Sequence, residues 1–260
     1  MISRRTIMEL GVALGLGGFS THSSAADWPV AGLIFPPLDY PIPPDARLLF
    51  PEGLDFISNG VGFGGMTIDS YEEAIPRVLP RAADLATAGA DLISVFGSSI
   101  TFYRGAEFHD DLIRQVSAHT DRPATTQSAG LLDGLNHINA KRVVLATAYT
   151  DTVMDRLRIF LQEHGFDVVG ARGMGYVRIP DGAATGPILH QLGIDAYASG
   201  SRVDAVVMSC GALRTLDVIN PLEAEIGVPV VSSTPHGLWH CARKLGLEAR
   251  VDGYGQVMAA

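Results

Sequence analysis

The sequence predicts an α/β protein made of two related halves, each built on a Rossmann-like parallel β-sheet. Short apolar runs rich in Val, Ile and Leu alternate with amphipathic stretches that end at glycine, which is typical of βαβ units. A weak internal repeat relates the first half of the chain to the second. We therefore expect a pseudo-twofold arrangement with the active site in a cleft between the two sheets.

The expected elements follow in order from Trp28. The predicted strands are Val30–Phe35, Asp91–Phe96, Arg142–Ala148, Asp167–Ala171, Asp204–Ser209 and Val228–Ser232. The predicted helices are Ser70–Ala88, Arg104–Ser117, Thr152–His164, Thr215–Ile226 and Pro235–Leu245. Pro76 and Pro80 lie inside the first of these helices, so we expect a kink there.

The internal repeat defines the boundary between the halves. Residues 91–100 align with residues 204–213, each running from an aspartate through an apolar strand to a small-residue loop. We predict an N-terminal half over residues 27–141 and a C-terminal half over residues 142–260, with a C-terminal tail able to cross back to the first half.

The repeat also pairs Gly97 with Cys210. Pro36 precedes Gly97 by 61 residues, and Tyr149 precedes Cys210 by the same 61 residues. Because the carboxyl ends of neighbouring parallel strands meet at one edge of a sheet, these four positions are expected to border the cleft.

The composition of the 260-residue chain is that of a globular protein with a large apolar core. Hydrophobic residues make up 47% and charged residues 18%, which excludes global disorder. The net charge is -9 and no basic run exceeds Arg4–Arg5, so nucleic acid is not an expected partner. Cys210 and Cys241 are too few for a disulfide scaffold or a four-thiolate metal site. The oligomeric state stays open between a monomer and a small homo-oligomer.

The first 26 residues have the parts of a bacterial twin-arginine export signal. Arg4–Arg5 precedes the apolar run Leu10–Phe19, and Ser24–Ala26 supplies small residues for cleavage. The apolar run has about ten residues, half of what a membrane span needs. We expect a periplasmic or secreted protein without a stable membrane span, and the alternative is a cytoplasmic protein with an N-terminal extension.

Two strand ends carry candidate chemistry. Cys210 follows an apolar strand and precedes Gly211, where backbone N–H groups surround a thiol that can act as nucleophile, acid or base. The alternative is a buried, inert cysteine. In the other half, Gly97 is followed by Ser98 and Ser99, which offer N–H and O–H donors to an anion. The alternative there is an ordinary capped, serine-rich loop.

Tyr149 and several apolar residues complete the expected cleft. The phenol of Tyr149, at the end of a strand, is placed to donate to the same anion, and the alternative is simple packing at the end of the sheet. Pro36, Pro37, Phe63 and Met66 add lining without titratable groups. A cleft with one thiol, neutral donors and apolar walls suits the stabilisation of an enolate-type anion.

Five short segments together resemble a known family. They are Phe35–Pro37, Gly97–Gly105, Ala146–Asp151, Ser209–Leu213 and Val228–Ser233, and they occur in order between Pro29 and Gly255. As a set they resemble arylmalonate decarboxylase, of the aspartate/glutamate racemase and maleate isomerase superfamily. The resemblance implies the racemase-like fold and no cofactor: no metal, biotin or nucleotide. The sequence also has no glycine-rich phosphate loop of Walker type.

The resemblance implies decarboxylation of a disubstituted malonate that bears an aryl or alkenyl group. One carboxylate is held in a dioxyanion hole, while the other faces an apolar pocket, leaves as CO₂ and yields an enediolate. The resemblance assigns Ser98, Ser99, Tyr149 and the Gly211 backbone to the dioxyanion hole, and Phe63, Met66 and Ile179 to the apolar pocket. Cys210 then protonates one face of the enediolate.

Cys210 has no second thiol opposite it, because Gly97 stands where racemases of the superfamily carry one. One acid protonates one face of a planar enediolate, so we expect stereospecific protonation and not two-base racemisation. Ser98 stands where the family has threonine, Gly65 where it has serine, and Gly182 where it has a larger apolar residue. These departures alter the shape expected for the pocket.

Two other functions stay open from the sequence. One is a maleate isomerase or an amino- or hydroxy-acid racemase that uses one thiol, and the other is a non-enzymatic periplasmic carboxylate-binding protein. His236, His240 and Cys241 lie together on a predicted helix, but no acidic partner has zinc-motif spacing, so a metal site is not expected. A disulfide between Cys210 and Cys241 is not expected, because one follows a strand and the other falls inside a helix.

Overall fold

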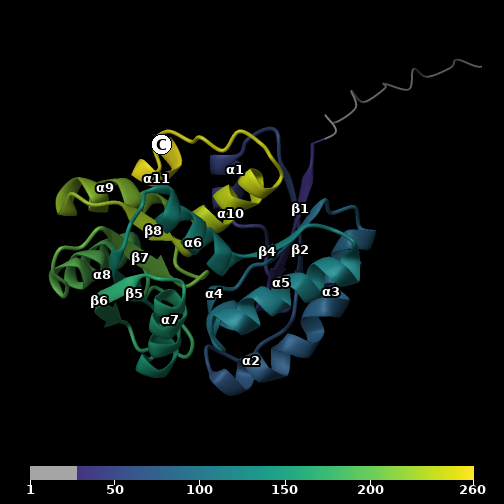
Figure 1. Ribbon diagram of the computed structural model, residues 1–260, viewed down its shortest axis with the longest axis horizontal. Helices are drawn as coiled ribbons and strands as arrows, with labels where there is room; N and C mark the ends of the chain where they lie inside the picture. The colour runs from purple at the N-terminus through teal and green to yellow at the C-terminus, as the bar shows by residue number, and fades with distance from the viewer. Residues whose placement is uncertain (1–27) are drawn as a thin grey trace, which may run out of the picture.

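The computed structural model describes residues 28–260 and contains two four-stranded parallel sheets (Figure 1). The strands are β1 (Val30–Phe35), β2 (Asp55–Gly60), β3 (Leu92–Val95), β4 (Ala124–Thr126), β5 (Arg142–Thr147), β6 (Asp167–Gly173), β7 (Ala205–Ser209) and β8 (Val230–Ser232). The sheets have the orders β2-β1-β3-β4 and β6-β5-β7-β8, with every neighbouring pair parallel. This repeated order confirms the predicted α/β fold. The predicted export signal lies outside the described residues.

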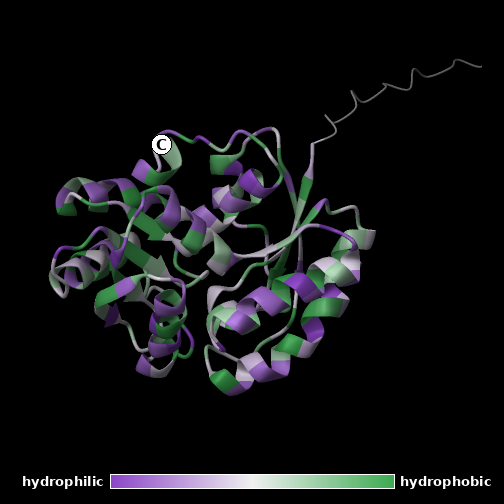
Figure 2. Cartoon of the chain, in the orientation of Figure 1, coloured by the Kyte–Doolittle hydropathy of each residue, from purple (hydrophilic) through white to green (hydrophobic). Residues whose placement is uncertain are grey.

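Helices cover the faces of both sheets (Figure 1). They are α1 (Pro44–Leu49), α2 (Ile68–Ala74), α3 (Val78–Thr87), α4 (Ser98–Phe102), α5 (Ala106–Thr120), α6 (Gln127–His137), α7 (Asp151–Glu163), α8 (Gly186–Ala198), α9 (Leu216–Ile226), α10 (Ser233–Lys244) and α11 (Gln256–Ala259). Figure 2 shows hydrophobic and hydrophilic residues alternating along outer helices such as α3 and α5, as amphipathic helices require. Within residues 28–260, every helix is too short or too polar to span a bilayer.

Equivalent aspartates confirm the internal repeat in three dimensions. The Asp91 carboxylate, just before β3, accepts a hydrogen bond from the backbone N–H of Val30 at 2.8 Å. The Asp204 carboxylate, just before β7, accepts from Lys141 and Arg142 at 2.9 and 2.7 Å. In both halves, therefore, the same side chain joins the starts of the two central strands.

The predicted helix over residues 70–88 is broken and not merely kinked. Helix α2 ends at Ala74, residues Ile75–Arg77 form a 3₁₀ turn, and α3 begins at Val78. Pro76 lies in that turn, where its missing N–H removes one bond from the helical ladder. The expected irregularity is confirmed at the first of the two prolines.

The sequence patterns did not predict strand β2 or helix α6, and the reasons differ. Edge strand β2 is polar over much of its length, and only Phe56 and Gly60 are buried in it. Helix α6 contains Gly130 and Gly134, which lower its helix propensity. A Cβ at Gly130 would lie 2.7 Å from the backbone oxygen of His236 in α10. The glycine therefore permits the close packing of α6 on α10.

Helix α10 joins the two halves. It follows β8 of the second sheet and packs against α6, α1 and β3 of the first half. Figure 1 shows α6 and α10 side by side between the two sheets. These helices place residues from the ends of β4 and β8 behind the edge where the sheets face each other.

Candidate active site

A cavity of about 80 Å³ lies at the carboxyl ends of β1, β3 and β7. Its lining residues are Phe35, Pro36, Pro37, Tyr40, Phe63, Met66, Phe96, Gly97, Ser98, Ser99, Cys210, Gly211 and Ala212. Both halves contribute, and the walls are mainly apolar. Among residues 28–260, the ionisable groups that line it are the thiol of Cys210 and the phenol of Tyr40.

Cys210 directly follows β7 and is buried at the cavity wall. Burial raises the pKa of its thiol to about 11, against the smaller lowering effect of the Ala212 and Leu213 backbone N–H groups. Its Sγ lies 3.6 Å from Sδ of Met66. The thiol therefore keeps its proton at neutral pH, which suits an acid better than a nucleophile.

Gly97 occupies the equivalent position at the end of β3. A Cβ built there would lie 2.4 Å from Cγ of Pro36 and 3.2 Å from Cγ2 of Ile100. The backbone of Gly97 is extended, so glycine is required by the contact with Pro36 and not by a left-handed conformation. A side chain at this position would require Pro36 to shift.

Ser98 lines the cavity, but its donors point into a buried network behind it. Its backbone N–H donates to Oε1 of Gln127 at 2.9 Å, and its Oγ lies 3.0 Å from the same oxygen. The Ser98 hydroxyl is also 2.8 Å from Oγ of Ser233, which accepts from the Cys210 N–H at 3.3 Å. The hydroxyl must turn away from this network to bind a ligand.

Ser99 lies in the first turn of α4 and also lines the cavity. The fully buried ring of Tyr71 packs beneath it, stacked on Phe63 with ring centroids 6.1 Å apart. Burial raises the pKa of Tyr71 well above its usual value, against the smaller lowering effect of Ser99. Tyr71 is therefore a neutral phenol close to the site, and its sequence surroundings gave no signal of this position.

Tyr149 and Ile179 do not line the cavity, unlike the other predicted site residues. Tyr149 is fully buried behind it, with its hydroxyl 3.3 Å from Oγ of Ser209, and burial raises its pKa well above the usual value. Ile179 lines a separate outer depression that meets the cavity at Ala212. The loop of Ile179 reaches the first half, where the N–H of Met66 donates to the Val177 carbonyl at 2.8 Å.

Several residues of the site were missed in the sequence. Tyr40 lies in a proline-rich loop without periodicity, and its ring packs on Phe35 at a centroid distance of 4.8 Å. Gln127 and Ser233 are the first residues of α6 and α10. Their position directly after β4 and β8 was a usable signal, because strand ends converge at the cleft.

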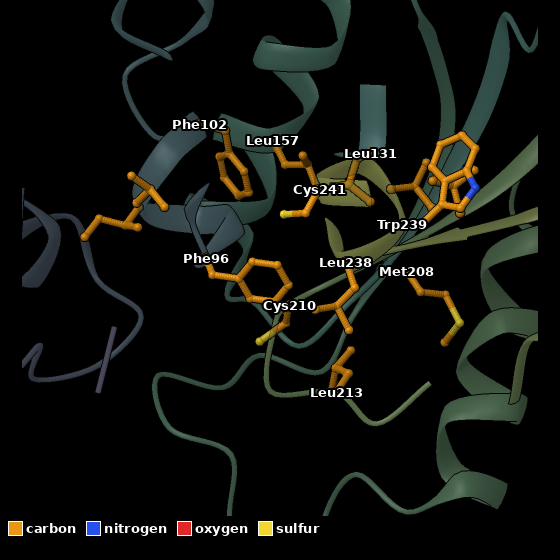
Figure 3. Close-up of a cluster of buried hydrophobic side chains, with 14 of the residues drawn as sticks. Phe96, Phe102, Leu131, Leu157, Met208, Cys210, Leu213, Leu238, Trp239 and Cys241 are labelled. Carbon is orange, nitrogen blue, oxygen red and sulfur yellow. The ribbon is translucent and has the colours of Figure 1, made fainter. Parts of the chain in front are cut away.

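The two histidines considered as metal ligands in the sequence, His236 and His240, form hydrogen bonds with other groups. His236 lies in the first turn of α10, as predicted, and its Nδ1 accepts from the Ser232 N–H at 3.0 Å. His240 bonds to Asp133 and Thr125, each at 2.8 Å. Both cysteines are free, as expected, and Figure 3 shows their thiols at separate places in the buried apolar cluster.

The two-sheet fold and the single-thiol cavity define a class: α/β proteins of the aspartate/glutamate racemase and maleate isomerase superfamily. Solved structures agree with this. An unliganded arylmalonate decarboxylase, 38% identical, superposes with a TM-score of 0.80 over 88% of this chain and 98% of that chain. A maleate isomerase of Nocardia farcinica, 20% identical, shares the fold with a TM-score of 0.78 over 88% of this chain and 98% of its own.

Sequence comparison places the chain within one family of this class. The arylmalonate decarboxylase family profile matches residues 31–258. The arylmalonate decarboxylase of Bordetella bronchiseptica is 38% identical over 234 residues, which cover 89% of this chain and 97% of that protein. The chain therefore belongs to the arylmalonate decarboxylase family and is an enzyme of the carboxy-lyase type.

Proposed function

We propose that this protein decarboxylates a disubstituted malonate bearing an aryl or alkenyl group, without a cofactor, and protonates the product on one face. The observation that carries the proposal is the single protonated thiol of Cys210, with Gly97 and no second thiol at the equivalent strand end. Family membership supports the reaction type.

In the proposed reaction, one substrate carboxylate binds to neutral donors and the other is left in the apolar part of the cavity. The donors are Ser98, Ser99, Tyr149 and the Gly211 N–H, with the Ser98 and Tyr149 hydroxyls turning from their present partners. Phe63 and Met66 surround the second carboxylate, whose charge they solvate poorly. This difference in solvation between the two carboxylates favours loss of CO₂, because the charge of the poorly solvated carboxylate is then dispersed.

The bond between the α-carbon and the leaving carboxylate breaks, and its electron pair passes into an enediolate. The donors stabilise this dianion where its charge develops. The Cys210 S–H then gives its proton to the α-carbon, and the thiolate regains a proton from solvent. A thiol with a pKa of about 11 is protonated and ready at neutral pH. A maleate isomerase or racemase that attacks through sulfur or removes a proton needs the thiolate, which burial disfavours here.

The test is CO₂ release from phenylmalonate and its methyl derivative by purified protein, after exhaustive dialysis against chelator. Turnover should persist, and in D₂O the product should carry one deuterium at the α-carbon in a single configuration. No CO₂ across a malonate panel would contradict the proposal. Deuterium exchange without CO₂ would select the isomerase or racemase, and thermal stabilisation by malonates without turnover would select a binding protein.

We also propose that the protein is exported through its N-terminal twin-arginine segment. The support is the sequence pattern of residues 1–26 alone. Mass spectrometry of protein recovered from the bacterial periplasm should give a chain that begins after Ala26. Full-length protein confined to the cytoplasm would contradict export.

A further inference from the structure

Gln127 and Thr234 are buried polar residues that have no part in the proposed reaction. Gln127 begins α6 in the first half, and Thr234 lies in the first turn of α10 in the second. Their exposed fractions are 0% and 4%. We propose that they are positioning residues, which form one hydrogen-bonded link from the Ser98 end of the site to the Cys210 end.

The link consists of three hydrogen bonds. The backbone N–H of Ser98 donates to Oε1 of Gln127 at 2.9 Å. Nε2 of Gln127 donates to Oγ1 of Thr234 at 3.1 Å. The Thr234 hydroxyl donates to the carbonyl oxygen of Gly211 at 3.0 Å. Since Gly211 directly follows Cys210, the link joins the chain after β3 to the chain after β7.

Backbone groups at both ends fix the direction of this link. The Ser98 N–H can only donate, so the amide oxygen of Gln127 faces it and the amide nitrogen faces Thr234. The Gly211 carbonyl can only accept, so Thr234 directs its single hydroxyl proton there. One arrangement satisfies all three bonds, and the loss of either side chain breaks it.

The bond at Gly211 orients a peptide group beside the thiol. The carbonyl of Gly211 and the N–H of Ala212 belong to one planar peptide unit and point in opposite directions. Holding the carbonyl on Thr234 therefore points the Ala212 N–H away from Thr234, and this N–H lowers the pKa of the Cys210 thiol. Burial raises the pKa of the Cys210 thiol to about 11, and a hydrogen bond from this N–H is the largest effect in the opposite direction.

Close packing prevents the link from relaxing. A Cβ at Gly211 would lie 2.9 Å from Oε1 of Gln127, and one at Gly237 would lie 3.0 Å from its Cγ. The Gln127 side chain is thus confined between backbone segments of the second half. The gap between the amide and the Gly211 backbone is too small for a methyl group, so a change in the amide affects Gly211.

The inference rests on the proposed function in treating Cys210 as the acid of the reaction. Without the link, the Ala212 N–H loses its alignment and the thiol becomes a weaker acid. Protonation of the enediolate then slows, so kcat falls.

The test measures alkylation of Cys210 by iodoacetamide between pH 8 and 10, followed by mass spectrometry of the Cys210 peptide. Thr234→Val, which removes the hydroxyl but keeps the shape, should slow alkylation at least about threefold, because a higher pKa lowers the thiolate fraction. Thr234→Ser keeps the hydroxyl and should restore the wild-type rate. The matched control is Thr125→Val, which removes a buried hydroxyl bonded to His240 and not to the link.

A merely structural role predicts the opposite direction, since a loosened site exposes the thiol and speeds its alkylation. Unchanged or faster alkylation of Thr234→Val, with the control at the wild-type rate, overturns the inference. Gln127→Met should slow alkylation by a smaller factor, because Thr234 keeps its bond to Gly211. If Thr234→Val does not fold, an unchanged or faster rate in Gln127→Met overturns the inference instead. Alkylation needs no turnover, so an inactive wild-type protein would contradict the proposed function alone.

Discussion

The strand ends after β3 and β7 are equivalent in the fold and different in their chemistry. After β3, Gly97 lies against Pro36 so closely that any side chain would force Pro36 to shift. After β7, Cys210 places a thiol at the cavity wall. Both ends continue into backbone that borders the same cavity. A symmetrical pair of sheets therefore carries an asymmetrical set of reactive groups, and in the proposed reaction this asymmetry sets the side from which the proton arrives.

The largest effect should come from removing the one thiol of this comparison. Cys210→Ser should lower kcat for phenylmalonate decarboxylation by about 10²–10⁴-fold, because the hydroxyl is a far weaker acid. Its melting temperature should stay near that of the wild type. Cys241→Ser, at the other free and buried cysteine, should keep most turnover. Equal activity losses in both variants would mean that the thiols act only through packing.

A second difference separates α6 from α10, whose fourth residues are Gly130 and His236. Burial lowers the pKa of His236 to about 4. Below pH 6.5 the His236 imidazole binds a proton in the unfolded chain but stays neutral in the folded protein. The free energy of unfolding should therefore fall by about 3 kcal/mol as the pH drops from 6.5 to 4. Urea unfolding at pH 6.5 and pH 4 measures this change.

The variant His236→Asn isolates the histidine contribution. Its free energy of unfolding should depend less on pH than that of the wild type over this range. The matched control His119→Asn, at an exposed position in the last turn of α5, should keep the wild-type dependence. An unaltered pH dependence in His236→Asn would assign the acid sensitivity to other groups.

Adding one methyl group at Gly97, after β3, tests how closely this position packs against Pro36. Gly97→Ala should lower the free energy of unfolding by about 1–3 kcal/mol, since the new Cβ overlaps Pro36. Gly186→Ala is the control, because a Cβ there meets open space, and it should stay within about 0.5 kcal/mol of the wild type. Adding Pro36→Ala to Gly97→Ala should recover part of the loss. Equal stability of the two single variants would refute the close contact.

The smallest effect should distinguish the two repeated aspartates. The Arg142 and Lys141 backbone N–H groups lower the pKa of Asp204, whereas the Asp91 carboxylate accepts from one backbone N–H, that of Val30. Asp204→Asn should cost under about 1 kcal/mol because the site is exposed, and Asp91→Asn should cost less. Denaturant unfolding of both variants provides the measurement. A larger loss for Asp91→Asn would reverse the expected order.

The central strands could be predicted because they are buried on both faces. β1 and β7 are continuous apolar runs, and their bounds in the structure match the predictions to within one residue. Edge strand β2 has no such run, since solvent reaches part of it. Helix α6 was not predicted because its glycines lower the helix propensity. These glycines serve tertiary packing, since Gly130 makes room for α10. The local hydrophobic pattern of a sequence indicates which residues are buried. It does not indicate which distant helix packs against a given glycine.

The site could be predicted where its residues follow the strand ends of the repeat. Cys210, Gly97 and Ser99 lie at the cavity for that reason. The roles of Gln127 and Thr234 depend on hydrogen bonds between residues 107 positions apart. Ile179 lies on a long loop whose path is set by contacts with the other half, so its separation from the cavity had no sequence signal.

The burial of Cys210 also has a redox consequence. With a pKa of about 11, roughly one thiol in ten thousand is ionised at pH 7, against about one in a hundred at the usual value of 9.0. Disulfide exchange and oxidation by peroxide both proceed through the thiolate. The desolvation that keeps the Cys210 thiol protonated, as the proposed reaction requires, therefore also slows its oxidation.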